Sequence, residues 1–186
     1  VKFRQGTDDL TGMRVAVQGL GNVGFHLCAM LHNAGAELIV ADINPAAVER
    51  ATTELGATAV SIDEILSVNA DILAPCALGG VINDISIGKL KAGIIAGAAN
   101  NQLEADRHGE MLRDMGVLYA PDYVINAGGV VEVHYCRQGR PVAETKRHIE
   151  SIGETVREIF TRAARENKST GFIADRLAEE RFGKAA

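Results

Sequence analysis

The sequence predicts an α/β protein with a doubly wound (Rossmann), mostly parallel sheet of strand order 3-2-1-4-5-6, followed by C-terminal helices. Residues 13–44 read, in order, as a strand, a glycine-rich turn, a helix, a strand and an acid. Short apolar runs then alternate with helical patterns along the rest of the chain. The polar and glycine-rich motifs follow the ends of these runs, and a parallel sheet gathers such positions at one edge.

The glycine motif of the first unit predicts a dinucleotide site. Gly19 permits a tight turn, the absence of a side chain at Gly21 lets the backbone approach a pyrophosphate, and Gly24 lets the helix pack closely on the strand. The start of that helix directs free N–H groups and a positive dipole end at phosphates. The predicted phosphate-binding residues are Gly19, Leu20, Gly21, Asn22, Val23 and Gly24.

The acid at the end of the second strand predicts which cofactor binds. Asp42 lies 18 residues beyond Gly24, where a carboxylate can accept hydrogen bonds from the ribose hydroxyls of adenosine. Asn44 before Pro45 is the better helix N-cap, which leaves Asp42 to a ligand. A carboxylate repels a 2′-phosphate, and residues 40–49 contain no Arg or Lys. We therefore expect NAD, not NADP, with Asp42 and Ile43 among the cofactor-binding residues.

The remaining elements follow in order. We expect strands at 15–17, 38–41, 59–61, 71–74, 94–98 and 117–120, and helices at 45–55, 106–115, 141–167 and 172–181. A short helix through Ser67 should begin at Ser61, because Glu64 gives the spacing of a capping box. The expected organisation is a connector at 1–12, a dinucleotide-binding domain at 13–140, and C-terminal helices at 141–186.

Composition bounds the class of protein. The 186 residues suffice for one sizeable core or one domain with an appendage, and a net charge of −5 argues against nucleic acid. No apolar run approaches the roughly 20 residues needed to cross a bilayer, and no signal peptide is visible, so neither a membrane nor export is expected. Three distant cysteines and five histidines without ligand spacing indicate no disulfide framework and no metal site, in a reducing, cytoplasmic compartment. Because the chain begins with Val1, we expect that sequence has been removed upstream.

Four motifs together carry a family resemblance. GLGNVG, APCALGGVIND, AGAANNQL and YAPDYVINAGGV resemble the cofactor domain of the glutamate/leucine/phenylalanine/valine dehydrogenases from about Leu10 to Phe182, most closely the leucine-type members. The resemblance implies NAD-dependent oxidative deamination of an L-amino acid to a 2-keto acid and ammonia, in a full-length homo-oligomer. It also implies roles for Cys76 and Ala77 beside the adenine side, for Ala98, Ala99 and Asn100 at the nicotinamide ribose, for Asn126 at the carboxamide, and for Val130 and Val133 in an aliphatic pocket.

Simpler interpretations of some of these residues remain open. Asn126 could be a turn residue or the N-cap of a helix at Gly128, and Asn100 could be an ordinary turn former. Cys76 fits a small packing residue better than a nucleophile, because no His or Lys lies near it in sequence. We expect a branched aliphatic substrate such as leucine, with a phenylalanine- or valine-type enzyme and a stand-alone NAD-binding module as alternatives.

No catalytic residue is assigned to this chain. The family's catalytic lysines and aspartate lie in an N-terminal substrate domain, and Lys89, Lys91 and Lys146 match none of them. We therefore interpret the chain as the cofactor half of a larger enzyme, inactive alone. Its last helices should pack on the other domain, which would leave the faces of Ile159, Phe160 and Phe172 partly exposed.

Overall fold

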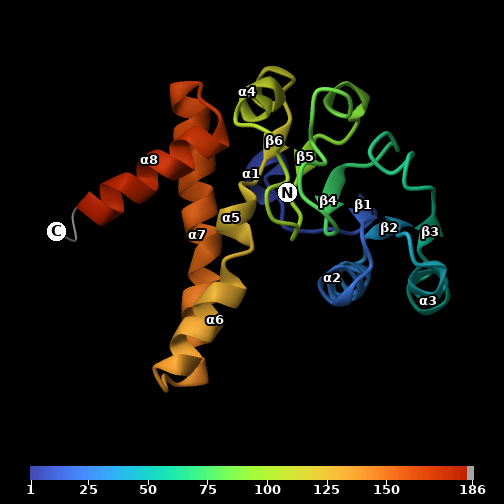
Figure 1. Cartoon of the computed structure of the whole chain (residues 1–186), viewed down its shortest axis with the longest axis horizontal. Helices are drawn as coiled ribbons and strands as arrows, with labels where there is room; N and C mark the ends of the chain where they lie inside the picture. The colour runs from blue at the N-terminus through green and yellow to red at the C-terminus, as the bar shows by residue number, and fades with distance from the viewer. Residues whose placement is uncertain (184–186) are drawn as a thin grey trace.

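The computed structural model describes residues 1–183, which form a six-stranded parallel sheet of order β3-β2-β1-β4-β5-β6 with helices on both faces (Figure 1). This confirms the predicted fold class. The strands are β1 Arg14–Gln18, β2 Glu37–Ala41, β3 Thr58–Ala59, β4 Ile72–Pro75, β5 Ile94–Ile95 and β6 Leu118–Tyr119. β1 lies at the centre, paired with β2 on one side and β4 on the other. The order therefore reverses beside β1, where such sheets bind ligands.

Two apolar cores cover the two faces of the sheet, as a parallel sheet requires. Side chains of α2 (Asn22–Asn33) and α3 (Pro45–Leu55) pack on one face around the fully buried Val17 and Val40. The other face packs against α4 (Arg107–Asp114) and the loops around the 3-10 helix η1 (Ile87–Lys89). The expected N-cap of α3 is present, because Asn44 accepts a hydrogen bond from the N–H of Ala46. Gly56 ends the helix with a positive φ of 63°.

Two local expectations are wrong. Residues 62–67 form turns and no helix, although the Glu64 carboxylate accepts a hydrogen bond from the N–H of Ser61 as in a capping box. The backbone bonds from Glu64 to the Ser61 carbonyl and from Ser67 to the Glu64 carbonyl span three residues each, as in turns. The strand expected at 94–98 ends at Ile95. Beyond it the chain crosses so close to β4 that a Cβ at Gly97 would overlap the carbonyl oxygen of Pro75.

The C-terminal helices form a separate layer beside the β6 edge of the sheet (Figure 1). They are α5 Asp122–Ile125, α6 Gly128–Arg137, α7 Val142–Glu166 and α8 Thr170–Gly183. Among residues 1–183, none of the helices is both long and apolar enough to span a membrane.

The expected exposure of this layer is wrong in part. Ile159 is only 1% exposed, because Ile173 and Leu177 of α8 cover it within a third apolar cluster. Phe160 is half-buried, and its ring contacts that of Phe3 in α1 (Lys2–Gln5) with 5.3 Å between centroids. Phe172 is 48% exposed, as expected.

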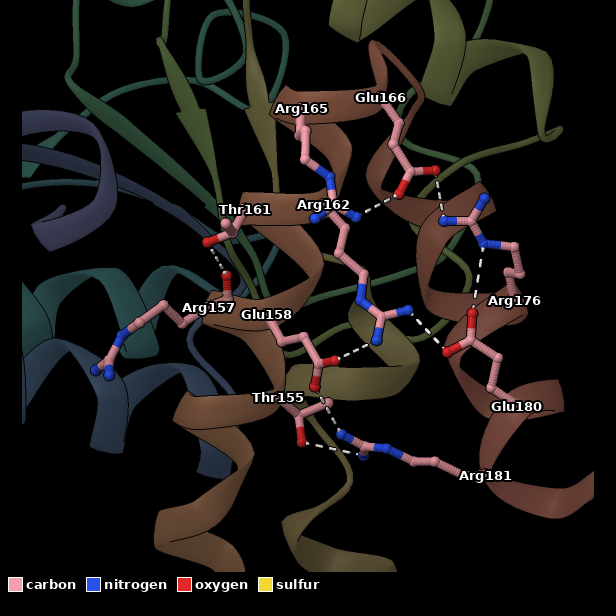
Figure 2. Close-up of polar contacts among 10 residues, drawn as sticks. All are labelled: Thr155, Arg157, Glu158, Thr161, Arg162, Arg165, Glu166, Arg176, Glu180 and Arg181. Atoms are coloured by element: carbon pink, nitrogen blue, oxygen red, sulfur yellow. Dashed lines mark hydrogen bonds and ion pairs between the residues drawn. The ribbon is translucent and has the colours of Figure 1, made fainter. Parts of the chain in front are cut away.

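A network of charged side chains joins α7 to α8 (Figure 2). Arg162 contacts Glu158 of its own helix at 2.6 Å and Glu180 of α8 at 2.8 Å. Arg181 of α8 returns to Glu158 at 3.1 Å. Arg176 also contacts Glu180, with 3.8 Å between Nε and Oε1. Each of the two carboxylates is thus shared between two arginines, and the connected ion pairs join α8 to α7.

Candidate functional site

The turn after β1 has the shape that the glycine motif predicts. Gly19 has a φ of 99°, and a Cβ there would lie 2.8 Å from the backbone nitrogen of Ala77. A Cβ at Gly24 would overlap the carbonyl oxygen of Gly19, so this glycine is needed for helix–strand packing. A Cβ at Gly21 would meet no protein atom within 4 Å. Gly19 is therefore needed for the fold, whereas Gly21 faces open space and is not.

Helix α2 begins directly at this turn without a side-chain cap. The N–H groups of its first turn, which include those of Asn22 and Val23, therefore lack a capping acceptor and are available to an anion. Asn22 and Val23 are exposed, whereas Leu20 is buried beneath the turn. This arrangement provides backbone donors and a dipole for a phosphate, with no side chain in its way.

Asp42 lies at the end of β2 and contacts the turn. Its Oδ2 accepts a hydrogen bond from the N–H of Leu20 at 2.5 Å, and its Oδ1 accepts one from Asn44 at 2.8 Å. The expectation that Asp42 is left to a ligand therefore needs correction, because both oxygens already serve the backbone. Each carboxylate oxygen still has a second lone pair for a hydroxyl.

A cavity of about 490 Å³ opens beside the turn, within the size range of ligand pockets. Ile43 and Leu78, which are 89% and 82% exposed, stand among its lining residues and offer apolar surface to a flat ring. Leu78 and Ile62 were not among the residues predicted for the site. Both are apolar residues in loops that follow strands, which is the signal that could have found them. The lining residues are Gln18, Gly19, Gly21, Asp42, Ile43, Ile62, Cys76, Ala77, Leu78, Gly79 and Val81.

The loop after β4 forms the adjacent wall. The N–H of Cys76 donates to the Gln18 carbonyl at 2.7 Å, and the Cys76 side chain lies against Gly24. Burial raises the pKa of the Cys76 thiol, which disfavours the thiolate. Cys76 therefore packs in the wall of the cavity, and its burial disfavours a nucleophilic role.

The loops after β5 and β6 meet at a pair of asparagines. Asn126 Nδ2 donates to Asn100 Oδ1 with 2.5 Å between the two atoms. Asn126 is the C-cap of α5 and lies in a turn, as one of the alternatives expects, but it is not the N-cap of α6, which is Ala127. The bond leaves the Asn126 carbonyl and the Asn100 amide NH₂ able to bind a carboxamide in both senses. The N–H of Ala99 donates to the carbonyl of Pro75, the last residue of β4, at 2.9 Å. Ala98 makes a backbone hydrogen bond to the Cys76 thiol, so both alanines connect the asparagine pair to β4 and the loop that follows it.

Val130 and Val133 lie one turn and more beyond Asn126 on α6, and like Asn100 and Asn126 they are not among the residues that line the cavity beside the glycine turn. They are 75% and 54% exposed on α6, which packs on α7.

Asp84, Glu104 and His108 also place three potential ligand atoms within 4.8 Å of one another. Both nitrogens of the buried His108 ring are engaged, Nδ1 by the N–H of Ala105 at 3.1 Å and Nε2 by Asp84 at 2.9 Å. Arg107 binds the same carboxylate at 2.7 Å. These contacts make the group a hydrogen-bonded network that supports the start of α4.

Comparison with known proteins places this geometry in context. The model of the glutamate/leucine/phenylalanine/valine dehydrogenase family matches residues 43–171. Leucine dehydrogenase of Bacillus cereus is 53% identical over 177 residues, which are 95% of this chain and 48% of that protein. Phenylalanine dehydrogenase of Caldalkalibacillus thermarum is 42% identical over 100% of this chain and 51% of its own length.

A solved structure also matches. The crystal structure of L-tryptophan dehydrogenase from Nostoc punctiforme superposes with a TM-score of 0.96 at 45% identity, over 99% of this chain and 55% of that one. The chain thus spans about half the length of the curated relatives it matches.

Proposed function

The chain belongs to the glutamate/leucine/phenylalanine/valine dehydrogenase family, and on that premise we propose that it is the NAD-binding part of an L-amino-acid dehydrogenase. The reaction is the oxidative deamination of an amino acid to its 2-keto acid and ammonia. The observation that carries the proposal is the turn at Gly21, where open space faces the uncapped start of α2 beside the Asp42 carboxylate. A dinucleotide diphosphate fits such a position.

The residues present fit NAD along the whole sheet edge. Backbone N–H groups at Gly21 to Gly24 would hold the diphosphate, Asp42 the adenosine ribose, and Ile43 and Leu78 the adenine ring. The amides of Asn100 and Asn126 would orient the carboxamide, so that one face of the nicotinamide is presented to substrate. Bound NAD supplies the hydride-accepting chemistry, and this chain contributes binding and orientation.

For the substrate we propose a branched aliphatic amino acid such as leucine. The identity of 53% to a leucine dehydrogenase supports this choice, whereas the relatives named for tryptophan and phenylalanine keep an aromatic substrate as the second candidate. Val130 and Val133 are exposed on α6, so they would line a substrate pocket only together with residues of the rest of the enzyme. One methylene of pocket size changes preference by only about 1–3 kcal/mol.

We further propose that residues 13–140 carry the cofactor and that residues 141–186 pack on a substrate domain in a homo-oligomeric enzyme. Exposed apolar side chains on this layer support the second part, among them Val142 at 83% and Phe172 at 48% exposure. A stand-alone NAD-binding module is the alternative. The gene upstream of Val1 distinguishes the two, because only the dehydrogenase requires a lysine-bearing domain there.

Calorimetry on the 186-residue chain tests the proposal. We expect NAD to bind and NADP to bind more weakly, and we expect no oxidation of leucine by the chain alone. Failure to bind NAD would refute the proposed function. Turnover of leucine by the purified chain would contradict the assignment of the catalytic groups to another domain.

A further inference from the structure

We propose that Asp122 is a positioning residue of the nicotinamide site, which acts with Gln102 and Tyr119 to hold Asn100 and Asn126 in their binding geometry. The inference rests on the proposed function, because it takes the two asparagines as part of the cofactor site. None of the three positioning residues lines the cavity beside the glycine turn.

The Asp122 carboxylate joins three segments of the chain. Asp122 is only 5% exposed and is the first residue of α5, whose C-cap is Asn126. Its Oδ2 accepts hydrogen bonds from the backbone N–H of Gln102 at 2.7 Å and from the hydroxyl of Tyr119 at 2.9 Å. One buried oxygen therefore connects the end of β6, the loop after β5 and the helix that ends at Asn126.

Gln102 extends this connection into the loop that carries Asn100. Its fully buried side chain donates from Nε2 to the carbonyls of Gly97 at 2.7 Å and Ala99 at 3.0 Å. Its Oε1 has no hydrogen-bond donor among the protein groups of residues 1–183. The Gln102 side chain therefore holds the loop through the two hydrogen bonds that its amide NH₂ donates.

The loop is also held from its other side. Asn101 has a φ of 52°, and its carbonyl accepts a hydrogen bond from the N–H of Gly80 at 2.7 Å. A Cβ at Gly79 would lie 2.8 Å from the carbonyl oxygen of Asn100. Asn100 therefore sits between the β4 loop and the Gln102 anchor, and its side chain reaches Asn126 only while both are in place.

Tyr119 completes the arrangement as a permanent donor. Burial, and then the neighbouring Asp122 charge, raise the pKa of the Tyr119 phenol, so that the hydroxyl keeps its proton. A buried hydrogen-bonded network thus links the loop that carries Asn100 to the helix that ends at Asn126. Its members are Gln102, Asp122 and Tyr119.

The test compares NAD with ADP on variants of the 186-residue chain by calorimetry, because ADP lacks the nicotinamide end. For Asp122→Ala and Asn126→Ala we expect NAD affinity to fall about 3- to 10-fold, the effect of one lost hydrogen bond, with ADP affinity unchanged. Tyr119→Phe keeps the packed ring and should lower NAD affinity about twofold. Asp122→Asn should restore most of the affinity, because its Oδ1 can still accept both bonds. Glu154→Gln, a change on exposed α7, is the control.

The outcomes separate the two proposals. If Asn126→Ala lowers the ratio of NAD to ADP affinity but Asp122→Ala and Tyr119→Phe do not, the positioning role is refuted and the proposed function stands. If the Asp122 and Tyr119 variants weaken NAD and ADP equally, their role is only structural and the inference fails. If the unaltered chain binds no NAD, the proposed function fails first. Should Asp122→Ala not fold, Tyr119→Phe decides by its ratio of NAD to ADP affinity.

Discussion

The carboxylate of Asp42 accepts a hydrogen bond from the backbone N–H of Leu20, with 2.5 Å between Oδ2 and the nitrogen. This bond connects the end of β2 to the glycine turn that follows β1. The acid that is proposed to bind the adenosine ribose thus also shapes the turn that is proposed to bind the diphosphate. Changes at Asp42 should therefore affect both parts of the cofactor.

Asp42→Ala should weaken NAD binding about 10-fold and reduce the preference for NAD over NADP. The ribose loses a charged acceptor, and the repulsion of a 2′-phosphate disappears. Loss of the bonds from Leu20 and Asn44 should also lower stability by about 1–2 kcal/mol. Calorimetry with both cofactors and denaturant unfolding measure these effects, with Glu49→Ala on exposed α3 as the control. Unchanged affinities for NAD and NADP would remove Asp42 from the site.

The glycines of the turn should separate binding from folding. Gly21→Ala adds a methyl group that meets no protein atom within 4 Å, so the melting temperature should stay within about 2 °C, while NAD affinity falls at least about 10-fold. Gly24→Ala places a methyl group on the Gly19 carbonyl and should destabilise the fold by about 2 kcal/mol or more. Melting curves and NAD titrations of both variants check this. Retention of full NAD affinity by Gly21→Ala would show that no phosphate approaches there.

The glycine turn is the part of the site that could be predicted from the sequence. The order strand, turn, helix, strand and acid is local, so Gly19, Gly24 and Asp42 were assigned from spacing alone. The Asn100–Asn126 bond was not predictable, because it joins residues 26 positions apart and depends on how β5 and β6 end. The roles of Gln102 and Asp122 were missed for the same reason. Asp122 carries only the weak signal of an acid between Pro121 and Tyr123, and Gln102, which follows Asn100 and Asn101 in a polar loop, carries none.

The burial of the C-terminal helices could be predicted from the sequence only in part. The helical spacing of Ile159 identifies an apolar face, but periodicity does not say which element covers it. α8 covers Ile159 within this chain, because α7 and α8 fold back on each other. Phe172, on the same layer, stays half exposed.

Asp84 should contribute to the acid sensitivity of the fold. Hydrogen bonds from Arg107, and then from His108, lower the pKa of the Asp84 carboxyl, with the Glu104 carboxylate also nearby. A carboxyl with a lowered folded pKa stabilises the protein above its unfolded value near 4, and this contribution disappears as the pH falls through the folded pKa. Asp84→Asn should therefore be less stable than the unaltered chain at pH 7.

Urea midpoints at pH 7, 5, 4 and 3 measure this difference. The gap between Asp84→Asn and the unaltered chain should be constant from pH 7 to 5 and shrink below about pH 4. Asp63→Asn, on an exposed turn, serves as the control and should show no such gap. A gap that persists unchanged at pH 3 would assign the effect to packing and not to ionisation.

The shared ion pairs between α7 and α8 should be sensitive to salt. In Arg162→Met the carboxylates of Glu158 and Glu180 lose a common cation, so like charges on the two helices are less well compensated (Figure 2). We expect a lower melting temperature at 50 mM NaCl and a smaller loss at 1 M NaCl, where screening acts over about 3 Å.

Lys146→Met is the matched control, because it removes a cation from a single exposed pair on the same helix, with 3.8 Å between Lys146 Nζ and Glu150 Oε1. Its melting temperature should change less than that of Arg162→Met. An equal loss in both variants, or a loss for Arg162→Met that salt does not reduce, would show that the stem of Arg162 stabilises the helix pair by packing and not by charge.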